Sequence, residues 1–330
     1  MSTRMALSAF GLALLLALTS LALGVREMTL ATVLEAFTAF DETNADHIVV
    51  RELRLTRGFA AILAGAALGV SGALMQSMTR NPLADPGLLG INAGGAFGVV
   101  LGIWGLQITA PGGLVIPALV GATVTSLLVL ILGSGGSKTG PDPVRMVLVG
   151  AALSALFLSL TWGLLILARQ TLDIYRYWVL GGFQQVDPAS MQAVLPLFVA
   201  GFVLAGLAAF LLNPLALGDD TARALGARVG FVRALTLCAI VLLCATTVSL
   251  AGPIAFLGLL VPHLVRPFAR GDVRRLAMGS AALGAILAIL ADLLGRMILP
   301  GQELEAGVIM ALIGGPFLIA MVQRRQAVSL

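Results

Sequence analysis

The chain has 330 residues, of which 59% are hydrophobic and 11% are charged, with a formal net charge of +4. Soluble domains carry roughly a quarter charged residues, so this composition excludes an ordinary soluble protein and indicates a polytopic membrane protein. Two cysteines and two histidines, with no metal-ligand spacing among them, argue against a disulfide framework and a metal centre.

Apolar stretches separated by short polar gaps predict an all-α protein with about ten transmembrane helices. The first stretch has spanning length and no clear cleavage pattern, which favours a retained helix over a cleaved signal peptide. In chain order the predicted spans are Met5–Leu23, Gly58–Met78, Gly94–Ile108, Leu114–Leu132, Val144–Ala168, Met191–Leu212, Val232–Leu250, Ile254–Phe268, Leu276–Leu299 and Ala306–Val322.

The span Ile254–Phe268 is shorter than the roughly 20 residues that a straight crossing needs. Pro262 interrupts it, because proline removes a helical hydrogen bond. We therefore expect the preceding Ala251–Pro253 to add a re-entrant turn or a half-helix.

Basic residues set the orientation of the predicted spans. Of the 20 Lys and Arg residues, 13 fall in one set of gaps and 7 in the other. The excess of basic residues marks the cytoplasmic side, so both termini are expected in the cytoplasm. Arg169 and Arg176 flank an expected outer loop over Thr171–Trp178, whose aromatic residues suit the membrane interface.

One cytoplasmic gap, residues 217–230, is predicted to form a small polar helix outside the membrane. Asp219 lies at its start and Arg223 further along, as the helix dipole favours. Ala222, Leu225 and Val229 have helical spacing and could form an apolar face for the groove of a partner protein. A solvated connecting helix explains the same residues equally well.

Arginines recur just outside the second span. Arg51, Arg54 and Arg57 are three residues apart and predict a basic stripe on the outer surface. Anchoring to lipid headgroups is the alternative role for such a stripe. Arg296 could join it, and lies one helical turn after Asp292, a spacing that allows an ion pair within the helix.

Several motifs of energy conversion are missing from the sequence. There is no Gly-x-x-x-x-Gly-Lys-Ser/Thr phosphate loop and no catalytic constellation, so the chain is expected to be no enzyme and to bind no cofactor. An ion-coupled secondary transporter would need a titrating path, for which the sequence offers Asp292 and His263 alone. Energy is therefore expected to come from a partner.

Eight motifs along the chain carry a resemblance to a known family. They are Leu53–Arg57, Gly65–Leu68, Ser71–Gln76, Arg80–Gly94, Tyr177–Gly182, Leu215–Gly226, Ala251–Leu264 and Ile313–Phe317. These motifs resemble the permease subunits of ATP-binding-cassette (ABC) importers for iron chelates and vitamin B12. The resemblance implies one transmembrane permease domain over residues 1–330 with the type II importer architecture. It also implies an inverted repeat that relates helices two to five to helices seven to ten.

The same resemblance implies the partners and the location. They are a second permease subunit, identical or related, two ABC ATPase subunits that use ATP, and an extracytoplasmic substrate-binding protein. No nucleic acid is implied. The location implied is the bacterial cytoplasmic (inner) membrane, and the cargo implied is a ferric siderophore, with cobalamin and haem as alternatives.

Three groups of residues match functional positions of that family. Arg54, Arg57 and Arg296 match arginines that dock the binding protein, and Asp142 with Pro143 matches a cytoplasmic gate. The segment that would couple to the ATPase comprises Leu217, Gly218, Asp219, Asp220, Thr221, Ala222, Arg223, Ala224, Leu225 and Gly226.

Overall fold

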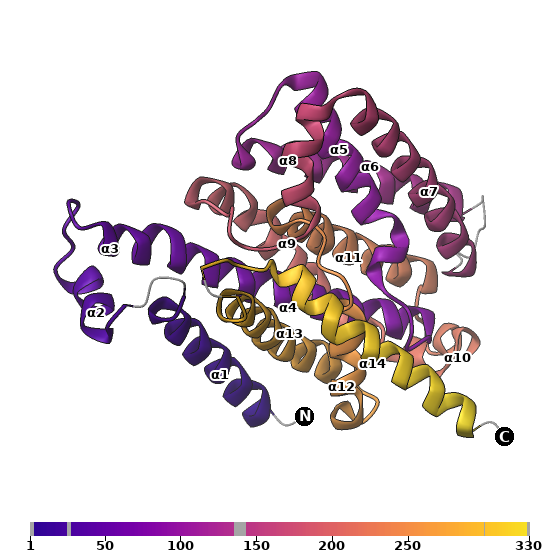
Figure 1. Ribbon diagram of the computed structural model, residues 1–330. Coiled ribbons are helices and arrows are strands. Elements are labelled where there is room, and N and C mark those ends of the chain that lie inside the picture. Colours follow the sequence, from indigo (N-terminus) through magenta and orange to yellow (C-terminus); the bar gives the residue numbers. More distant parts are fainter. Residues whose placement is uncertain (1–2, 25–27, 135–142, 300, 329–330) are drawn as a thin grey trace.

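The computed structural model describes residues 3–24, 28–134, 143–299 and 301–328. Within these residues all regular structure is helical (Figure 1). Each of the ten predicted spans is a helix, which confirms the predicted fold class. These helices are α1 (Thr3–Ala22), α4 (Leu55–Thr79), α5 (Ile91–Leu106), α6 (Val115–Ser134), α7 (Pro143–Leu167), α9 (Pro188–Leu211), α11 (Val229–Ala251), α12 (Leu257–Ala269), α13 (Val273–Met297) and α14 (Ala306–Val328).

Shorter elements connect these spans. The predicted outer loop over Thr171–Trp178 is wrong, because these residues belong to an amphipathic helix that buries Thr171, Tyr175 and Trp178 on one face. The connecting elements are α2 (Leu30–Thr38), α3 (Ala45–Ile48), the π-helix η1 (Val49–Arg54), the 3-10 helices η2 (Pro86–Leu89), η3 (Pro111–Leu114) and η4 (Pro214–Leu217), α8 (Arg169–Val179) and α10 (Asp219–Ala224).

Six segments of the described chain are long and apolar enough to cross a membrane, and four further apolar helices are shorter. Two of the short ones, α5 and α12, have 16 and 13 residues. At 1.5 Å per residue they span about 24 and about 20 Å, less than the roughly 30 Å of a hydrocarbon core. An irregular segment precedes each of them, residues 80–90 and 252–256, so each half of the chain has a long helix, an irregular stretch and a short helix.

Helix α4 is the most enclosed element and lies at the centre of the molecule, against α13, α11 and α12 (Figure 1). Glycines let the backbones touch. A Cβ atom on Gly65 would lie 2.3 Å from the carbonyl oxygen of Gly284 on α13, and one on Gly72 would lie 1.8 Å from that of Gly258 on α12. Close backbone approach of this kind replaces the hydrophobic effect as the source of helix association in lipid.

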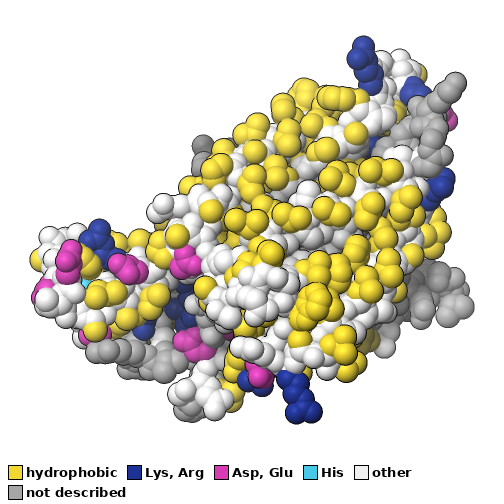
Figure 2. Space-filling view, turned by 90° about the horizontal axis from the view of Figure 1, so that it is seen from above, with side chains coloured by type: hydrophobic (Ala, Val, Ile, Leu, Met, Phe, Trp, Pro, Cys, Tyr) yellow, Lys and Arg dark blue, Asp and Glu magenta, His cyan; other side chains and the backbone are white. Residues whose placement is uncertain are grey.

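The outer helices expose apolar faces instead. Large apolar side chains are exposed along α7, α9 and α14, for example Ile166, Val203 and Leu312. Figure 2 shows hydrophobic side chains covering most of the visible surface, with charged side chains confined to its ends. Such a surface suits lipid or another apolar subunit rather than water.

The contact between α4 and α13 yields a stability prediction. Gly65→Val would place a branched side chain against the Gly284 backbone, and overpacking costs roughly 1–3 kcal/mol. We expect the variant to unfold at a lower temperature in detergent. Size-exclusion chromatography after heating measures this temperature as the loss of the folded peak. Gly206→Val on α9 is the matched control, because a Cβ there meets no atom within 4 Å. Equal unfolding temperatures for the two variants would contradict the packing argument.

Candidate functional site

The three arginines predicted to dock a partner lie together where α4 begins and α13 ends, beside the end of α1, at the end of the molecule that is predicted to face outward. Arg54 and Arg296 are only 8% and 4% exposed. The predicted stripe on the outer surface is therefore wrong in its geometry, since Arg54 points inward. Arg51, by contrast, is exposed, and its guanidinium carbon lies 4.4 Å from the centre of the Phe40 ring.

The local backbone explains the difference. Arg51 and Arg54 lie in the π-helix η1, whereas Arg57 lies in the α-helix α4. A π-helix has more residues per turn, so each residue rotates less about the axis than in an α-helix. Within the π-helix, three residues therefore turn Arg54 further from the face of Arg51 than they would in an α-helix, which leaves Arg51 exposed and Arg54 buried.

Arg57 and Arg296 share the buried carboxylate of Asp292. Arg57 donates from Nε and Nη2 to Asp292 Oδ1, at 2.8 and 2.7 Å, and Arg296 donates from Nη2 to Oδ2. The remaining edge of Arg57 donates from Nη1 to Glu303 Oε2 at 2.7 Å. The ion pair predicted between Asp292 and Arg296 is confirmed, and Glu303 completes a network that the sequence did not predict.

Arg54 and Arg296 also bind the end of α1. Arg54 Nη1 donates to the carbonyl of Leu21 at 2.7 Å, and Arg296 Nη1 donates to those of Ser20 and Leu23 at 3.2 and 3.4 Å. The last carbonyls of a helix lack partners within the helix and form its negative end. The two guanidinium groups satisfy these carbonyls and fasten α1 to α4 and α13.

Glu305 lies next to this network. Burial raises its pKa to about 7, Arg57 opposes the shift, and the carboxylates of Asp292 and Glu303 reinforce it. Its side chain packs on Gly182, where an added Cβ would meet Glu305 Oε2 at 1.7 Å. Glu305 thus joins the outer network to the turn that follows α8.

At the opposite end of α4 from the arginines, α10 lies within the segment predicted to couple to an ATPase. Gly218 has a φ of 115°, a backbone conformation that side chains rarely adopt, and it starts the helix. Asp219 is the anchor of the segment. Its Oδ1 accepts from Arg80 at the end of α4, and its Oδ2 accepts from Arg233 Nη2 of α11 at 2.8 Å.

The apolar face predicted for this segment is wrong. Ala222 and Val229 are buried within the protein, and Leu225 alone of the three is exposed, at 65%. Outward-facing Asp220 and Arg223 form an ion pair at 2.9 Å. A partner would therefore meet a polar surface with one apolar side chain.

The gate predicted at Asp142 and Pro143 stays a prediction. Asp142 lies outside the described residues, and Pro143 is the first residue of α7.

The predicted coupling segment, Leu217 to Gly226, extends beyond α10 at both ends. Leu217 ends η4, and Gly218 precedes the helix formed by Asp219 to Ala224. Leu225 and Gly226 follow that helix, and Gly226 has a positive φ.

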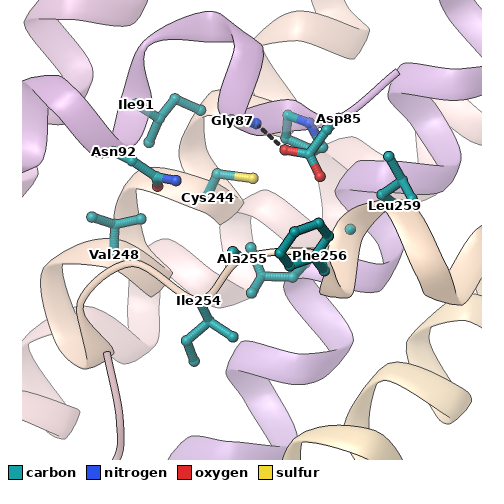
Figure 3. A pocket seen from close by; sticks show the side chains of 13 residues that line it. Asp85, Gly87, Ile91, Asn92, Cys244, Val248, Ile254, Ala255, Phe256 and Leu259 are labelled. Carbon is teal, nitrogen blue, oxygen red and sulfur yellow. Dashed lines mark hydrogen bonds between the residues drawn. The ribbon is translucent and has the colours of Figure 1, made fainter. Parts of the chain in front are cut away.

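A cavity of about 220 Å³ lies inside the molecule, between the irregular segments that precede α5 and α12 (Figure 3). Asp85, Asn92 and Cys244 turn their polar atoms toward it, and Phe256 forms part of its wall. Asp85 accepts from the backbone N–H of Gly87 at 2.7 Å. Sequence analysis assigned no role to Asp85, although a carboxylate before a proline in apolar surroundings is a usable signal.

The carboxylates of these sites pair with arginines or backbone groups. In the described ranges, no three or more His, Cys, Asp or Glu side chains are grouped as metal ligands. The outer carboxylates instead neutralise arginines. The chemistry available is charge pairing at both ends of the molecule, joined by a tightly packed helical core.

The buried carboxylate at the outer site predicts a large stability effect. Asp292→Asn would leave Arg57 and Arg296 without their shared counter-ion, and breaking a buried pair costs about 3–5 kcal/mol. We expect a marked fall in unfolding temperature in detergent. Asp173→Asn, which alters an exposed pair on α8, is the control and should change little. Similar losses in both variants would contradict the assigned role.

Glu305 predicts a pH effect. Its pKa rises from 4.5 to about 7 on folding, so between these values the folded state binds more protons and stability falls as pH rises. Glu305→Gln removes this dependence. The unfolding temperature of the variant should therefore exceed that of the wild type more at pH 8 than at pH 5. Exposed Glu42→Gln serves as control, and a pH-independent difference would refute the expectation.

The comparisons with known proteins match this architecture. A model described as the FecCD transport family matches residues 12–324. The chain is 42% identical over 309 residues to the ferric enterobactin transport system permease protein FepD of Escherichia coli (strain K12), covering 93% of this chain and 91% of FepD. It is 40% identical over 279 residues to the Fe(3+) dicitrate transport system permease protein FecC of the same organism, covering 84% and 83%.

A solved structure is similar over the whole length. It is described as an inward-facing conformation of a metal-chelate type ABC transporter, and it covers 97% of this chain and 99% of its own with a TM-score of 0.84 and 26% identity. Because the family model covers nearly the entire sequence, the chain belongs to the FecCD transport family.

Proposed function

We propose that this chain is the membrane-spanning permease subunit of an ABC importer that carries a ferric siderophore across the bacterial cytoplasmic membrane. The observation that carries the proposal is the 42% identity, over 93% of the chain, to a permease whose name states a ferric enterobactin transport system. Energy comes from separate ATPase subunits, because the sequence holds no phosphate loop of its own.

The partners follow from the distribution of surfaces. A second permease, identical or related, covers exposed apolar faces such as those of α7 and α14. Two ATPase subunits dock on the polar surface of α10, and a substrate-binding protein docks at the outer arginine network. Both termini lie in the cytoplasm, as the count of basic residues favours.

The contacts of α10 support a coupling role. Asp219 binds Arg80 at the inner end of α4 and Arg233 on α11, and Arg80 Nε also donates to the carbonyl of Leu215 at 3.1 Å. A push on α10 therefore reaches two spanning helices directly. The gate at Asp142 and Pro143 remains part of the proposal on the strength of the family resemblance alone.

Two alternatives are less well supported. Cobalamin or haem would use the same architecture with another binding protein, but the two relatives above are named for ferric chelates. An ion-coupled transporter would need Asp292 to exchange protons. Asp292 instead serves as counter-ion to two buried guanidinium groups, and His263 lies edge-on to Phe317 with ring centres 5.7 Å apart.

Uptake in reconstituted liposomes tests the function. Complexes of this chain with its ATPase and binding protein should accumulate ⁵⁵Fe-labelled ferric siderophore only when ATP is supplied to the ATPase side. Liposomes with this chain alone should accumulate none. Uphill accumulation by the chain alone, abolished by a protonophore, would refute the importer proposal and favour ion coupling.

Charge reversal at α10 tests the coupling surface. Arg223→Glu should lower ATP-driven uptake by about tenfold or more, because it puts an acidic side chain where the ATPase docks. Arg176→Glu is the matched control: both arginines are exposed and each pairs with an aspartate three residues earlier. Equal uptake by both variants, at equal membrane levels, would exclude α10 as the docking surface.

A further inference from the structure

The outer arginines differ in how fully their N–H groups are occupied by stable partners. Arg54 and Arg296 bind carbonyls at the end of α1, and Arg296 also binds Asp292. Arg57 divides its guanidinium between Asp292 and Glu303. An incoming anion could therefore reach Arg57 most readily, and only along its Nη1 edge.

The two carboxylates that hold Arg57 are unequal. The side chain of Asp292 is 2% exposed, belongs to the helix α13 and serves a second arginine. The side chain of Glu303 is 27% exposed. Among the described residues, Arg57 is its only hydrogen-bond and ion-pair partner. Removing Glu303 from Arg57 leaves Arg57 paired with Asp292, whereas removing Asp292 would strand two buried cations.

Glu303 also lies outside the helices, so its side chain can leave Arg57 without unfolding one. The described residues 298, 299 and 301–305 connect α13 to α14, and Gly301 has a φ of 72°. The neighbouring Leu304 N–H donates to the carbonyl of Gly295 at 2.9 Å, which holds the backbone beside Glu303, so an exchange on Arg57 needs only the Glu303 side chain to turn away. Figure 2 shows acidic and basic side chains gathered at this end of the molecule.

We propose that Glu303 is an internal placeholder for an acidic side chain of a protein that docks from the outer side. This inference rests on the proposed function, in which a binding protein docks at this site. The carboxylate of the partner replaces Glu303 on Arg57 Nη1, while Asp292 keeps the other edge of the guanidinium. One charge-assisted hydrogen bond breaks and an equivalent one forms.

The exchange sets the strength of docking. Because the arginine is already paired, the partner gains only the difference between two similar contacts, and the complex stays weak and readily released. Without Glu303, the partner would gain the full contact. The placeholder also keeps a buried cation neutralised whenever no partner is present.

The test measures binding of an acidic peptide to purified chain in phosphatidylcholine nanodiscs. Fluorescent hexaglutamate is titrated and its anisotropy is followed at low salt. Glu303→Gln should bind about tenfold more tightly than the wild type. Glu303→Asp keeps the charge but shortens the side chain by one methylene, so it should bind about threefold more tightly. Glu52→Gln removes one exposed acidic charge from the same side and should change affinity less than twofold.

The pattern across variants decides the matter. Equal gains for Glu303→Gln and Glu52→Gln would reduce the effect to net charge and overturn the proposal, as would no gain for either Glu303 variant. A gain that disappears when phosphatidylglycerol is added to the nanodiscs would assign the site to lipid headgroups and also overturn it. The assay uses neither ATP nor iron, so its outcome is separate from that of the uptake experiment.

Discussion

Backbone contact through glycine fixes α4 at the centre of the protein, and the placement of both charged sites follows from it. Gly65 meets Gly284 on α13, and Gly72 meets Gly258 on α12. With its position set by these contacts, α4 brings Arg57 to Asp292 at its first turn and Arg80 to Asp219 at its last. The helix joins the two faces of the molecule as a single packed rod.

Buried charge imposes the second constraint. An unpaired guanidinium within an apolar protein is costly, so the outer arginines must find acceptors from the chain itself. They use one shared aspartate, one glutamate and the free carbonyls of α1. These pairs fix which helices meet at this end of the molecule.

The spanning helices were predictable because each is a continuous apolar run, and hydropathy alone reveals such runs. The orientation of Arg54 was not predictable from the sequence, because it depends on a π-helix and no residue pattern indicates one. Ala222 and Val229 matched an apolar face at helical spacing, yet both are buried inside this protein, which only tertiary contacts reveal.

Asp85 and Phe256 meet at the cavity although 170 residues separate them, so local sequence could not predict that they lie together. The docking and coupling residues came from family motifs, and the structure added their partners Glu303 and Arg80.

The two irregular segments at the cavity have a mechanical consequence. A regular helix keeps its length because every internal carbonyl is bonded, so the long helices can tilt and slide but hardly stretch. Residues 80–90 and 252–256 lack that ladder over most of their length, and Asp85 to Gly87 and Ile254 to Phe256 within them line the cavity. Deformation under load will concentrate where they meet, giving an otherwise stiff bundle a soft joint at its middle.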